Sequence, residues 1–417
     1  MNRGLCPCHD TFGTCPGTAK GEGLNLARAR AVCSVTRIPM QLETRLFKKG
    51  VGWSAPLPAG LDSNRTLVLL FASPSFAEEP APLRELRAAF PLAHIIGCSS
   101  AGEIHADQLH DDCVVAAIAR FDEVTLRAVS APTGPGIESF AAGADIARRL
   151  VSPDLRAMIV LSEGLDVNGS ELVRGINSVT PPSVVVTGGL AADGDRFRRT
   201  WVFDGAEVAT RRLVAVGLFG DRLAVTHGSK GGWDIFGIER RVTRSVGNVL
   251  YELDGKPALK LYKEYLGERA TGLPATALLF PLAMRAVDGD EKQLVRTVLA
   301  VNEEAQSLTF AGDIPEGSLA QLMRANFDRL VQGASDAATL ARTHEAREAI
   351  LAVAVSCVGR RIVLGQRTEE ELEATLDVLP HVTQQVGFYS YGEISPFASG
   401  SCDLHNQTMT LSTFSER

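Results

Sequence analysis

The stretch GCSSAGEI, residues 97–104, is repeated in outline by GFYSYGEI, residues 387–394. Five positions match in register, so that Gly97, Ser100, Gly102, Glu103 and Ile104 correspond to Gly387, Ser390, Gly392, Glu393 and Ile394. Each stretch continues a short apolar run of the kind that forms a buried strand. One chain therefore builds the same glycine-rich loop twice, each time after a strand and each time closing in Gly-Glu-Ile.

A strand, a helix, a second strand and a glycine-rich loop recur in this order along the chain. The three sets are 66–72, 82–90 and 94–104, then 157–164, 170–179 and 183–195, then 348–358, 368–380 and 386–394. A partial fourth set lies at 277–284 and 297–304. Alternating strands and helices predict α/β layers, and consecutive strands at 113–121 and 124–131 predict mixed sheets. We therefore expect an α/β fold of repeated βαβ-type modules, with mixed sheets layered with helices, in two domains.

One helix of the third set carries a local signal for its own start. Thr368 and Glu371 are spaced like a capping box, in which the two side chains bond to the free N–H groups of the first turn. This pattern predicts that the helix begins at Thr368.

The composition argues against a nucleic-acid-binding protein, a membrane protein and a small secreted domain. The 417 residues carry a net charge of −7, which disfavours binding to nucleic acid or to an anionic membrane. No apolar run reaches the roughly 18 residues of a membrane span. The eight cysteines do not form the framework of a small secreted domain. We expect a cytoplasmic protein with reduced thiols, without a membrane span and without nucleic acid as a partner.

Residues 1–39 differ from the rest of the chain because glycine, proline and cysteine crowd them. Cys6, Cys8, His9 and Cys15 supply enough ligands for a tetrahedral zinc site. The other interpretation is a disordered leader, or a start of translation placed before the true one at Met40. We expect the leader.

Three motifs together resemble one known family. Between the halves lies ELDGKPALKLYKEYLGE, residues 252–268, which opens with a turn at Asp254-Gly255. This segment, GCSSAGEI, and GFYSYGEISP with a downstream HNQT resemble the FIST family, whose name refers to F-box and intracellular signal transduction. The resemblance implies an N-terminal FIST domain over 40–252 and a C-terminal FIST domain over 253–417.

The resemblance also implies a function. Bacterial FIST domains are thought to sense small ligands, with amino acids proposed, and some members bind haem and report nitric oxide to a histidine kinase. This chain contains no kinase or cyclase module, so its output would pass to a separate partner, such as a histidine kinase or a cyclic-dinucleotide signalling protein. We expect a sensor and no enzymatic activity, with a haem sensor and an unrecognised hydrolase or transferase as the alternatives.

The glycine loops could contact such a ligand directly. Glycine brings backbone N–H groups close to an anion, and a carboxylate such as that of Glu103 or Glu393 could hold an ammonium group. The alternative is that each Gly-Glu-Ile is a turn whose glutamate bonds to the backbone. The candidate ligand-binding residues are Gly97, Ser99, Ser100, Gly102, Glu103, Gly188, Gly189, Asp193, Tyr389, Ser390, Tyr391, Gly392, Glu393, Asn406 and Thr408.

Some of these candidates rest on weaker patterns. Asp193 lies close to the place where a counterpart of Glu103 would fall in the second set. Tyr389 and Tyr391 could line a pocket or pack in the core. Cys98 could be a nucleophile if the N–H groups of its loop lowered its thiol pKa.

Haem would need an axial ligand from the protein. His110 and His405 are the candidates, because they occupy matching places after the first and third loops. A histidine hydrogen-bonded within the structure is the alternative. No other metal site is expected from the sequence.

Overall fold

Each of the three predicted sets folds into a parallel pair of strands joined through a helix. The structure is a computed structural model that describes residues 40–134, 136–285, 293–343, 348–396 and 401–417. The parallel pairs are β3 (Thr66–Ala72) with β4 (His94–Ser99), β9 (Leu155–Ser162) with β10 (Val185–Leu190), and β24 (Ile350–Cys357) with β25 (Thr383–Ser390). The connecting helices are α1 (Ala81–Ala89), α3 (Gly169–Asn177), and the pair α6 (Val358–Leu364) and α7 (Thr368–Leu376).

A return strand completes each module by pairing antiparallel with the first strand of its parallel pair. The return strands are β7 (Cys113–Arg120), β13 (Arg212–Phe219) and β28 (Met409–Glu416). Parallel and antiparallel pairs therefore occur in the same sheets. The predicted α/β fold with mixed sheets is confirmed.

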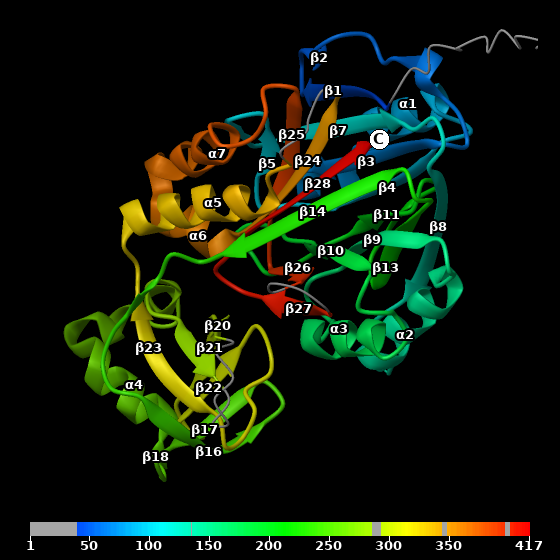
Figure 1. The fold of residues 1–417 in the computed structure, drawn as a ribbon. Coiled ribbons are helices and arrows are strands. Elements are labelled where there is room, and N and C mark those ends of the chain that lie inside the picture. The colour runs from blue at the N-terminus through cyan, green and yellow to red at the C-terminus, as the bar shows by residue number, and fades with distance from the viewer. Residues whose placement is uncertain (1–39, 135, 286–292, 344–347, 397–400) are drawn as a thin grey trace, which may run out of the picture. The chain divides into compact units, whose positions relative to one another are not determined.

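Three sheets grow from these modules. The first is ordered β12 (Val208–Ala209), β11 (Val202–Phe203), β4, β3, β7, β1 (Gln41–Lys48) and β2 (Gly52–Trp53). The second is ordered β27 (Cys402–His405), β26 (Gly392–Pro396), β10, β9, β13 and β8 (Thr125–Pro132). The third is ordered β14 (Leu223–Lys230), β28, β24, β25, β5 (Glu103–His105) and β6 (Gln108–His110). Figure 1 shows the long β14 beside β28.

The three modules exchange strands in a cycle. The hairpin β5–β6 of the first module joins the sheet of the third, β26–β27 of the third joins the sheet of the second, and β11–β12 of the second joins the sheet of the first. The strands that follow the return strands are exchanged too, because β8 pairs with β13 and β14 pairs with β28. These sheets therefore run across the predicted boundary between residues 252 and 253.

A fourth sheet lies between the second and third modules in sequence, and its pairings are antiparallel. Its strands are β20 (Gln293–Arg296), β19 (Leu282–Arg285), β23 (Leu319–Arg324), β16 (Arg240–Val246), β17 (Val249–Leu253), β22 (Ser307–Phe310) and β21 (Val298–Asn302), with β15 (Asp234–Ile235) on β23 and β18 (Lys256–Pro257) on β17. Helix α4 (Ala258–Leu266) packs on β17. The prediction of a partial fourth βαβ set at 277–284 and 297–304 was wrong, because β19 and β21 are separate antiparallel strands here.

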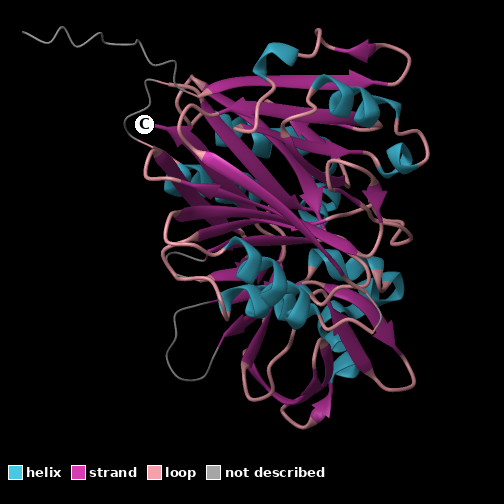
Figure 2. Ribbon diagram, turned by 90° about the vertical axis from the view of Figure 1, so that its right-hand side faces the viewer, coloured by secondary structure: helices cyan, strands magenta, loops and turns pink. Residues whose placement is uncertain are grey.

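Helices pack against the sheets at several places around the strands (Figure 2). Helix α2 (Ser139–Leu150) packs on α3, and α5 (Phe327–Ala341) lies along β14 and β28. Apart from Leu330, the buried residues of α5 are glycine and alanine, and a Cβ atom at Gly228 of β14 would overlap the carbonyl oxygen of Ala337. Glycine and alanine therefore let α5 approach β14 closely. Short 3-10 segments complete the elements: η1 (Ala59–Leu61), η2 (Pro74–Ala77), η3 (Gly267–Gly272), η4 (Ala275–Leu279) and η5 (Gly365–Arg367).

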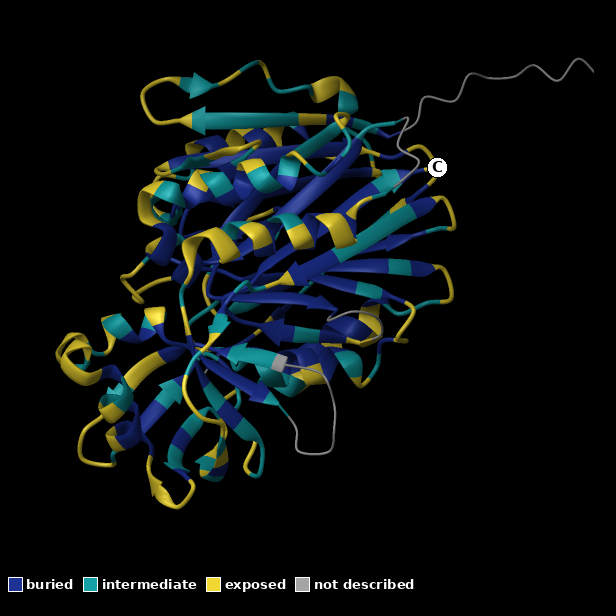
Figure 3. Cartoon of the chain, turned by 60° about the vertical axis from the view of Figure 1, so that its left-hand side comes forward, coloured by how far each residue is buried: buried dark blue, intermediate teal, exposed yellow. Residues whose placement is uncertain are grey.

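The central strands β3 and β24 are buried along their whole length, and β9 is buried except at Arg156 (Figure 3). Phe71 of the first sheet stacks on Phe388 of the third at a centroid distance of 4.7 Å. The sheets therefore share an apolar core. Within the described residues, no helix is both long enough and apolar enough to cross a membrane.

The predicted capping box is absent from the start of α7. Thr368 donates its hydroxyl to the carbonyl oxygen of Gly365, and Arg367 occupies the cap position. Glu371 is fully buried and accepts hydrogen bonds from Arg360. The Glu371 carboxylate therefore pairs with the buried Arg360 and does not cap the N-terminus of α7.

Candidate functional site

The Gly-Glu-Ile triplets mark the points where the chain crosses from one sheet to another. Glu103 begins β5 opposite Phe388 of β25, and Glu393 lies in β26 opposite Gly189 of β10. The first glycines of the loops are needed for packing. A Cβ atom at Gly97, Gly188 or Gly387 would overlap the carbonyl oxygen of the adjacent strand residue, which is Leu70, Val160 or Ala354. The loop is therefore a structural crossover in every module.

Glu103 and Glu393 have matching environments. The hydroxyl of Ser100 donates to Glu103, and that of Ser390 donates to Glu393 over 2.8 Å. Cys113 Sγ also donates to Glu103 over 3.3 Å. Burial raises the pKa of each carboxyl to about 8. Both carboxyls are therefore mostly neutral at pH 7, and they satisfy buried hydroxyls instead of presenting a charge.

Asp193 is not the counterpart of Glu103, which corrects the position inferred from the sequence. Val202 of β11 lies opposite Cys98 and takes the place that Glu103 and Glu393 hold in the other sheets. The loop after β10 is longer, and Asp193 Oδ2 accepts the N–H groups of Arg198 and Arg199 at 2.9 Å. Asp193 therefore organises its own loop.

Other predicted residues also have partners within the protein. Ser99 Oγ accepts the N–H of Trp201 at 3.1 Å. Cys98 is fully buried, and burial raises its thiol pKa well above the ordinary value. The thiol therefore stays protonated, contrary to the lowered pKa considered for a nucleophile.

Tyr389 belongs to a buried polar network behind the third loop. Its hydroxyl donates to Glu371 Oε1 over 2.7 Å, and Ser356 donates to the same oxygen over 3.0 Å. Arg360 pairs with Glu371 over 2.6 Å, and neither side chain has any exposed surface. Arg360 also donates to the carbonyl oxygens of Gly231 and Leu330. The network thus ties α7 to α5 and to the segment that follows β14.

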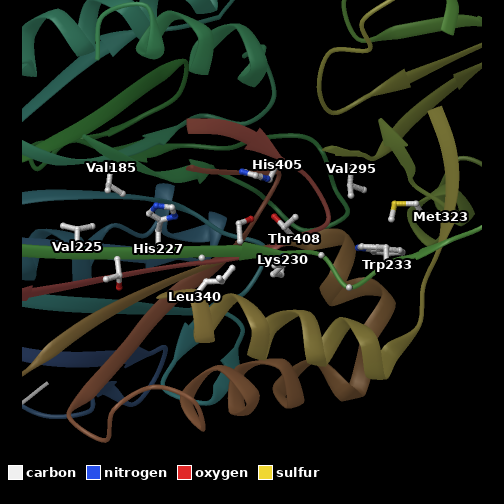
Figure 4. A pocket seen from close by; sticks show the side chains of 15 residues that line it. Val185, Val225, His227, Lys230, Trp233, Val295, Met323, Leu340, His405 and Thr408 are labelled. Atoms are coloured by element: carbon white, nitrogen blue, oxygen red, sulfur yellow. The ribbon is translucent and has the colours of Figure 1, made fainter. Parts of the chain in front are cut away.

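A cavity of about 770 Å³ lies along β14 and that following segment. Its lining is Val185, Val225, Thr226, His227, Gly228, Ser229, Lys230, Gly231, Gly232, Trp233, Val295, Met323, Leu340, His405 and Thr408. Figure 4 shows His227 and Val185 on one side of β14 and Leu340 on the other, with Trp233 and Met323 at the far end. Its size is typical of a small-molecule site.

The polar groups of this lining are incompletely satisfied. His227 Nδ1 and Ser229 Oγ are buried and have no hydrogen-bond partner among the described residues. Burial lowers the pKa of His227, so its ring is neutral at pH 7. Lys230 supplies a positive charge, and the described residues of the lining include no aspartate or glutamate. Because buried polar atoms are normally paired, this wall suits a ligand with an anionic group.

Two of the predicted residues, Thr408 and His405, reach this cavity. Thr408 donates both its N–H, over 3.2 Å, and its hydroxyl, over 2.9 Å, to Glu393. His405 Nε2 donates to the carbonyl of Ser395 over 2.9 Å. Asn406 is fully buried and both of its side-chain amide atoms are unpartnered among the described residues. The third crossover loop therefore supports the cavity wall through Thr408.

Tyr391 lies at a smaller hollow of about 270 Å³, together with Leu190 and Phe197. Its ring stacks on Phe197 at a centroid distance of 4.6 Å, and its hydroxyl donates to Asp193. The structure thus brings Thr408 and His405 to one cavity and Tyr391 to another. Among the described residues, the other predicted ligand-binding residues do not belong to the lining of either of these two cavities.

His110 and His405, the two candidate haem ligands, lie opposite Glu103 and Glu393 in register. They therefore hold equivalent places in two different sheets. Among the described residues, no group of three or more histidine, cysteine, aspartate or glutamate side chains is arranged to hold a metal ion. The zinc ligands considered at Cys6, Cys8, His9 and Cys15 lie outside the described residues.

The segment HGSKGGW, residues 227–233, contributes most of the polar wall and was missed from the sequence. Its apolar neighbours identified only a strand. The signal that could have revealed it is the Gly231-Gly232 pair directly after the strand, flanked by a histidine, a serine and a lysine.

Comparison with known proteins matches the FIST N domain over residues 66–256 and the FIST C domain over residues 258–396. The chain is also similar to an uncharacterized protein of Methanocaldococcus jannaschii. The two are 26% identical over 351 aligned positions, which cover 73% of this chain and 64% of that relative. FIST domains are associated with signal transduction and small-ligand sensing. The order of the two matched domains, and the crossover loops that they contain, place this chain in the FIST family.

Proposed function

We propose that this chain is a cytoplasmic sensor that binds a small, amino-acid-like carboxylate in the cavity along β14. The observation that carries the proposal is the pair of buried, unpartnered polar atoms, His227 Nδ1 and Ser229 Oγ, beside Lys230. A carboxylate at the end of β14 would pair with Lys230 on the α5 side of the strand, and polar groups elsewhere on the ligand would bond to His227 and Ser229 on the other side. Trp233 and Met323 offer apolar surface to the rest of the ligand.

The buried network offers a route from ligand to output. The carbonyl of Gly231 in the cavity wall accepts from Arg360, which also bonds to Leu330 of α5 and pairs with Glu371 of α7. A ligand that shifts the segment after β14 would change the position of these helices. Such a shift in conformational equilibrium would be read by a separate partner, such as a histidine kinase or a cyclic-dinucleotide signalling protein.

The experiment is ligand binding with a matched pair of lysine variants. Free amino acids and short peptides are screened by thermal shift, and each hit is titrated by calorimetry. Lys230→Met should weaken binding about tenfold to a hundredfold, because a hydrogen bond to a charged group is worth about 1.5 to 3 kcal/mol. Lys256→Met, which changes an exposed lysine outside the cavity lining, should bind like the unchanged protein. Equal affinity of both variants would refute the assignment of the site.

A haem sensor is the second candidate, and the environment of His227 favours it. Its neutral ring lines a cavity that also contains Trp233 and Met323. A neutral imidazole nitrogen is a suitable axial ligand of haem iron. His227 fits this role better than His405, whose Nε2 is engaged with Ser395. Haem titration with a Soret band that His227→Ala abolishes and His110→Ala preserves would favour this candidate.

A further inference from the structure

Strand β14 has one open edge within the described part of the chain. It ends the third sheet, and its strand neighbour there is β28. All eight residues from Leu223 to Lys230 pair with β28 without a bulge. Native proteins usually protect a regular edge by a bulge, a proline or a charge, because its N–H and C=O groups can pair with another chain.

The hydrogen-bond pattern shows which residues of β14 point to the open side. Arg417 donates its N–H to the carbonyl oxygen of Arg222 over 2.9 Å. In an antiparallel pair, residues facing the partner alternate with residues facing away. Residues 224, 226, 228 and 230 therefore bond to β28, and Val225, His227 and Ser229 present their backbone groups outward.

The pairing of β28 with β24, on its other side, confirms which residues of β14 bond to β28. Cys357 donates its N–H to the carbonyl oxygen of Thr408 over 3.1 Å, just beyond the paired residues of β24 and β28. Residue 408 and every second residue after it therefore bond to β24. Met409 and every second residue after it in β28 therefore bond to β14, which agrees with the pattern derived from Arg417 and Arg222.

The open edge is a wall of the cavity. Val225, His227 and Ser229 all line it, and Lys230 lies at the C-terminal end of the same strand. The cavity continues from there to Trp233, Met323 and Val295, so an apolar surface adjoins the positive charge. The wall thus combines three features in order: backbone groups that can pair with a strand, a cation and an apolar patch.

We propose that the ligand is a short extended peptide that adds a strand to β14, with its C-terminal carboxylate at Lys230. This inference rests on the proposed function and names its ligand. With the carboxylate at the end of β14, the peptide runs parallel to the strand. Val225 to Ser229 span about 13 Å at roughly 3.3 Å per residue, which suits four to five peptide residues. Main-chain bonds supply affinity in this mode, and an apolar C-terminal side chain against Trp233 and Met323 supplies selectivity.

The first test uses a pool of N-acetylated pentapeptides that end in leucine with a free carboxylate. Equilibrium dialysis against the full chain, read by mass spectrometry, identifies the peptides that are retained. Resynthesis with a C-terminal amide should weaken binding at least tenfold. N-methylation of every second residue should abolish binding, and N-methylation of the intervening residues should leave it within threefold, because only one set of amide groups can face β14.

A second test changes the edge strand of the protein in place of the peptide. Ser229→Pro and Ser229→Ala both remove the hydroxyl, but only proline removes the outward N–H. Because the Ser229 hydroxyl is itself proposed to contact the ligand, the alanine variant sets the baseline. Binding at least tenfold weaker in the proline variant than in the alanine variant, with an unchanged circular dichroism spectrum, supports strand addition, and equal binding by the two variants contradicts it. If proline disturbs the fold, the N-methyl scan of the peptide still decides, because it leaves the protein unchanged.

The outcomes separate this inference from the proposed function. Free amino acids that bind in a Lys230-dependent way, with no peptide retained, would overturn strand addition and leave the sensor site standing. Peptides that bind equally well whichever set of amides is methylated would also overturn strand addition. Retention of neither amino acids nor peptides would overturn both.

Discussion

Replacing Glu393 with glutamine should change how the stability of the protein depends on pH. Glu393 is fully buried, and its oxygens accept from Ser390 and Thr408. Its pKa rises from an ordinary 4.5 to about 8 in the folded protein. A glutamine amide can keep the bond to Thr408 through its oxygen and donate to Ser390 through its nitrogen. The substitution therefore removes the ionisation with little change in shape.

The sign follows from proton binding in the two states. Between pH 4.5 and 8 the folded protein keeps a proton on Glu393 that the unfolded chain releases. The free energy of unfolding therefore falls as pH rises through this window. One pKa unit corresponds to about 1.4 kcal/mol, so this one group costs on the order of 3 kcal/mol at pH 7 relative to pH 4.5. Glu393→Gln should remove that slope.

The assay is urea unfolding of the unchanged protein and of Glu393→Gln at several pH values from 5 to 8. The difference between their unfolding free energies should change by several kcal/mol across the range, with the variant gaining as pH rises. Glu304→Gln, at an exposed surface position, should track the unchanged protein. Parallel profiles for the Glu393 variant and the unchanged protein would refute the argument that burial governs this carboxyl.

Two further predictions concern the packing of the third module. Arg360→Met leaves Glu371 without its cation in a fully buried site and should cost about 3 to 5 kcal/mol of stability. The double variant with Glu371→Leu should recover only part of this loss, because Tyr389 and Ser356 then lose their acceptor, and a double-mutant cycle by urea unfolding measures the coupling. Gly387→Ala places a Cβ atom against the carbonyl of the neighbouring strand and should destabilise by more than about 2 kcal/mol, whereas Gly60→Ala meets no atom within 4 Å and should be nearly neutral. A thermal midpoint for Gly387→Ala equal to that of Gly60→Ala would contradict the packing argument.

The repeated modules could be predicted because their causes are local. Apolar runs identify buried strands, and the glycines at 97, 188 and 387 recur because each strand approaches its neighbour too closely for a side chain. The partners of the crossover strands could not be predicted. Nothing near Glu103 indicates that its strand pairs with β25, far along the chain. Such pairing is decided by the whole sheet and not by a local pattern.

The residues of the candidate site also divide into those that local sequence patterns predicted and those that depend on the arrangement of the sheets. Thr408 and His405 were found from motif and repeat, and both lie at the cavity. His227 and Ser229 were missed because their significance comes from the position of β14 at the end of its sheet. Asp193 was misplaced because the second loop is longer, which moves the matching position to Val202. Spacing along one sequence cannot reveal an insertion that only the strand register exposes.

The cyclic exchange of strands explains why the cavity lies where it does. Each of the three sheets continues beyond its return strand, with β1 in the first sheet, β8 in the second and β14 in the third. In the first sheet, β2 pairs with β1 and forms the edge. The chain leaves β14 through Gly231-Gly232, and a Cβ atom at Gly232 would meet the carbonyl of Arg329 near the start of α5. This turn directs the chain into the fourth sheet, whose Met323 and Val295 complete the lining. A ligand at β14 therefore contacts both the third module and the fourth sheet. Binding energy gained from both contacts would favour the conformations in which the module and the sheet are held together.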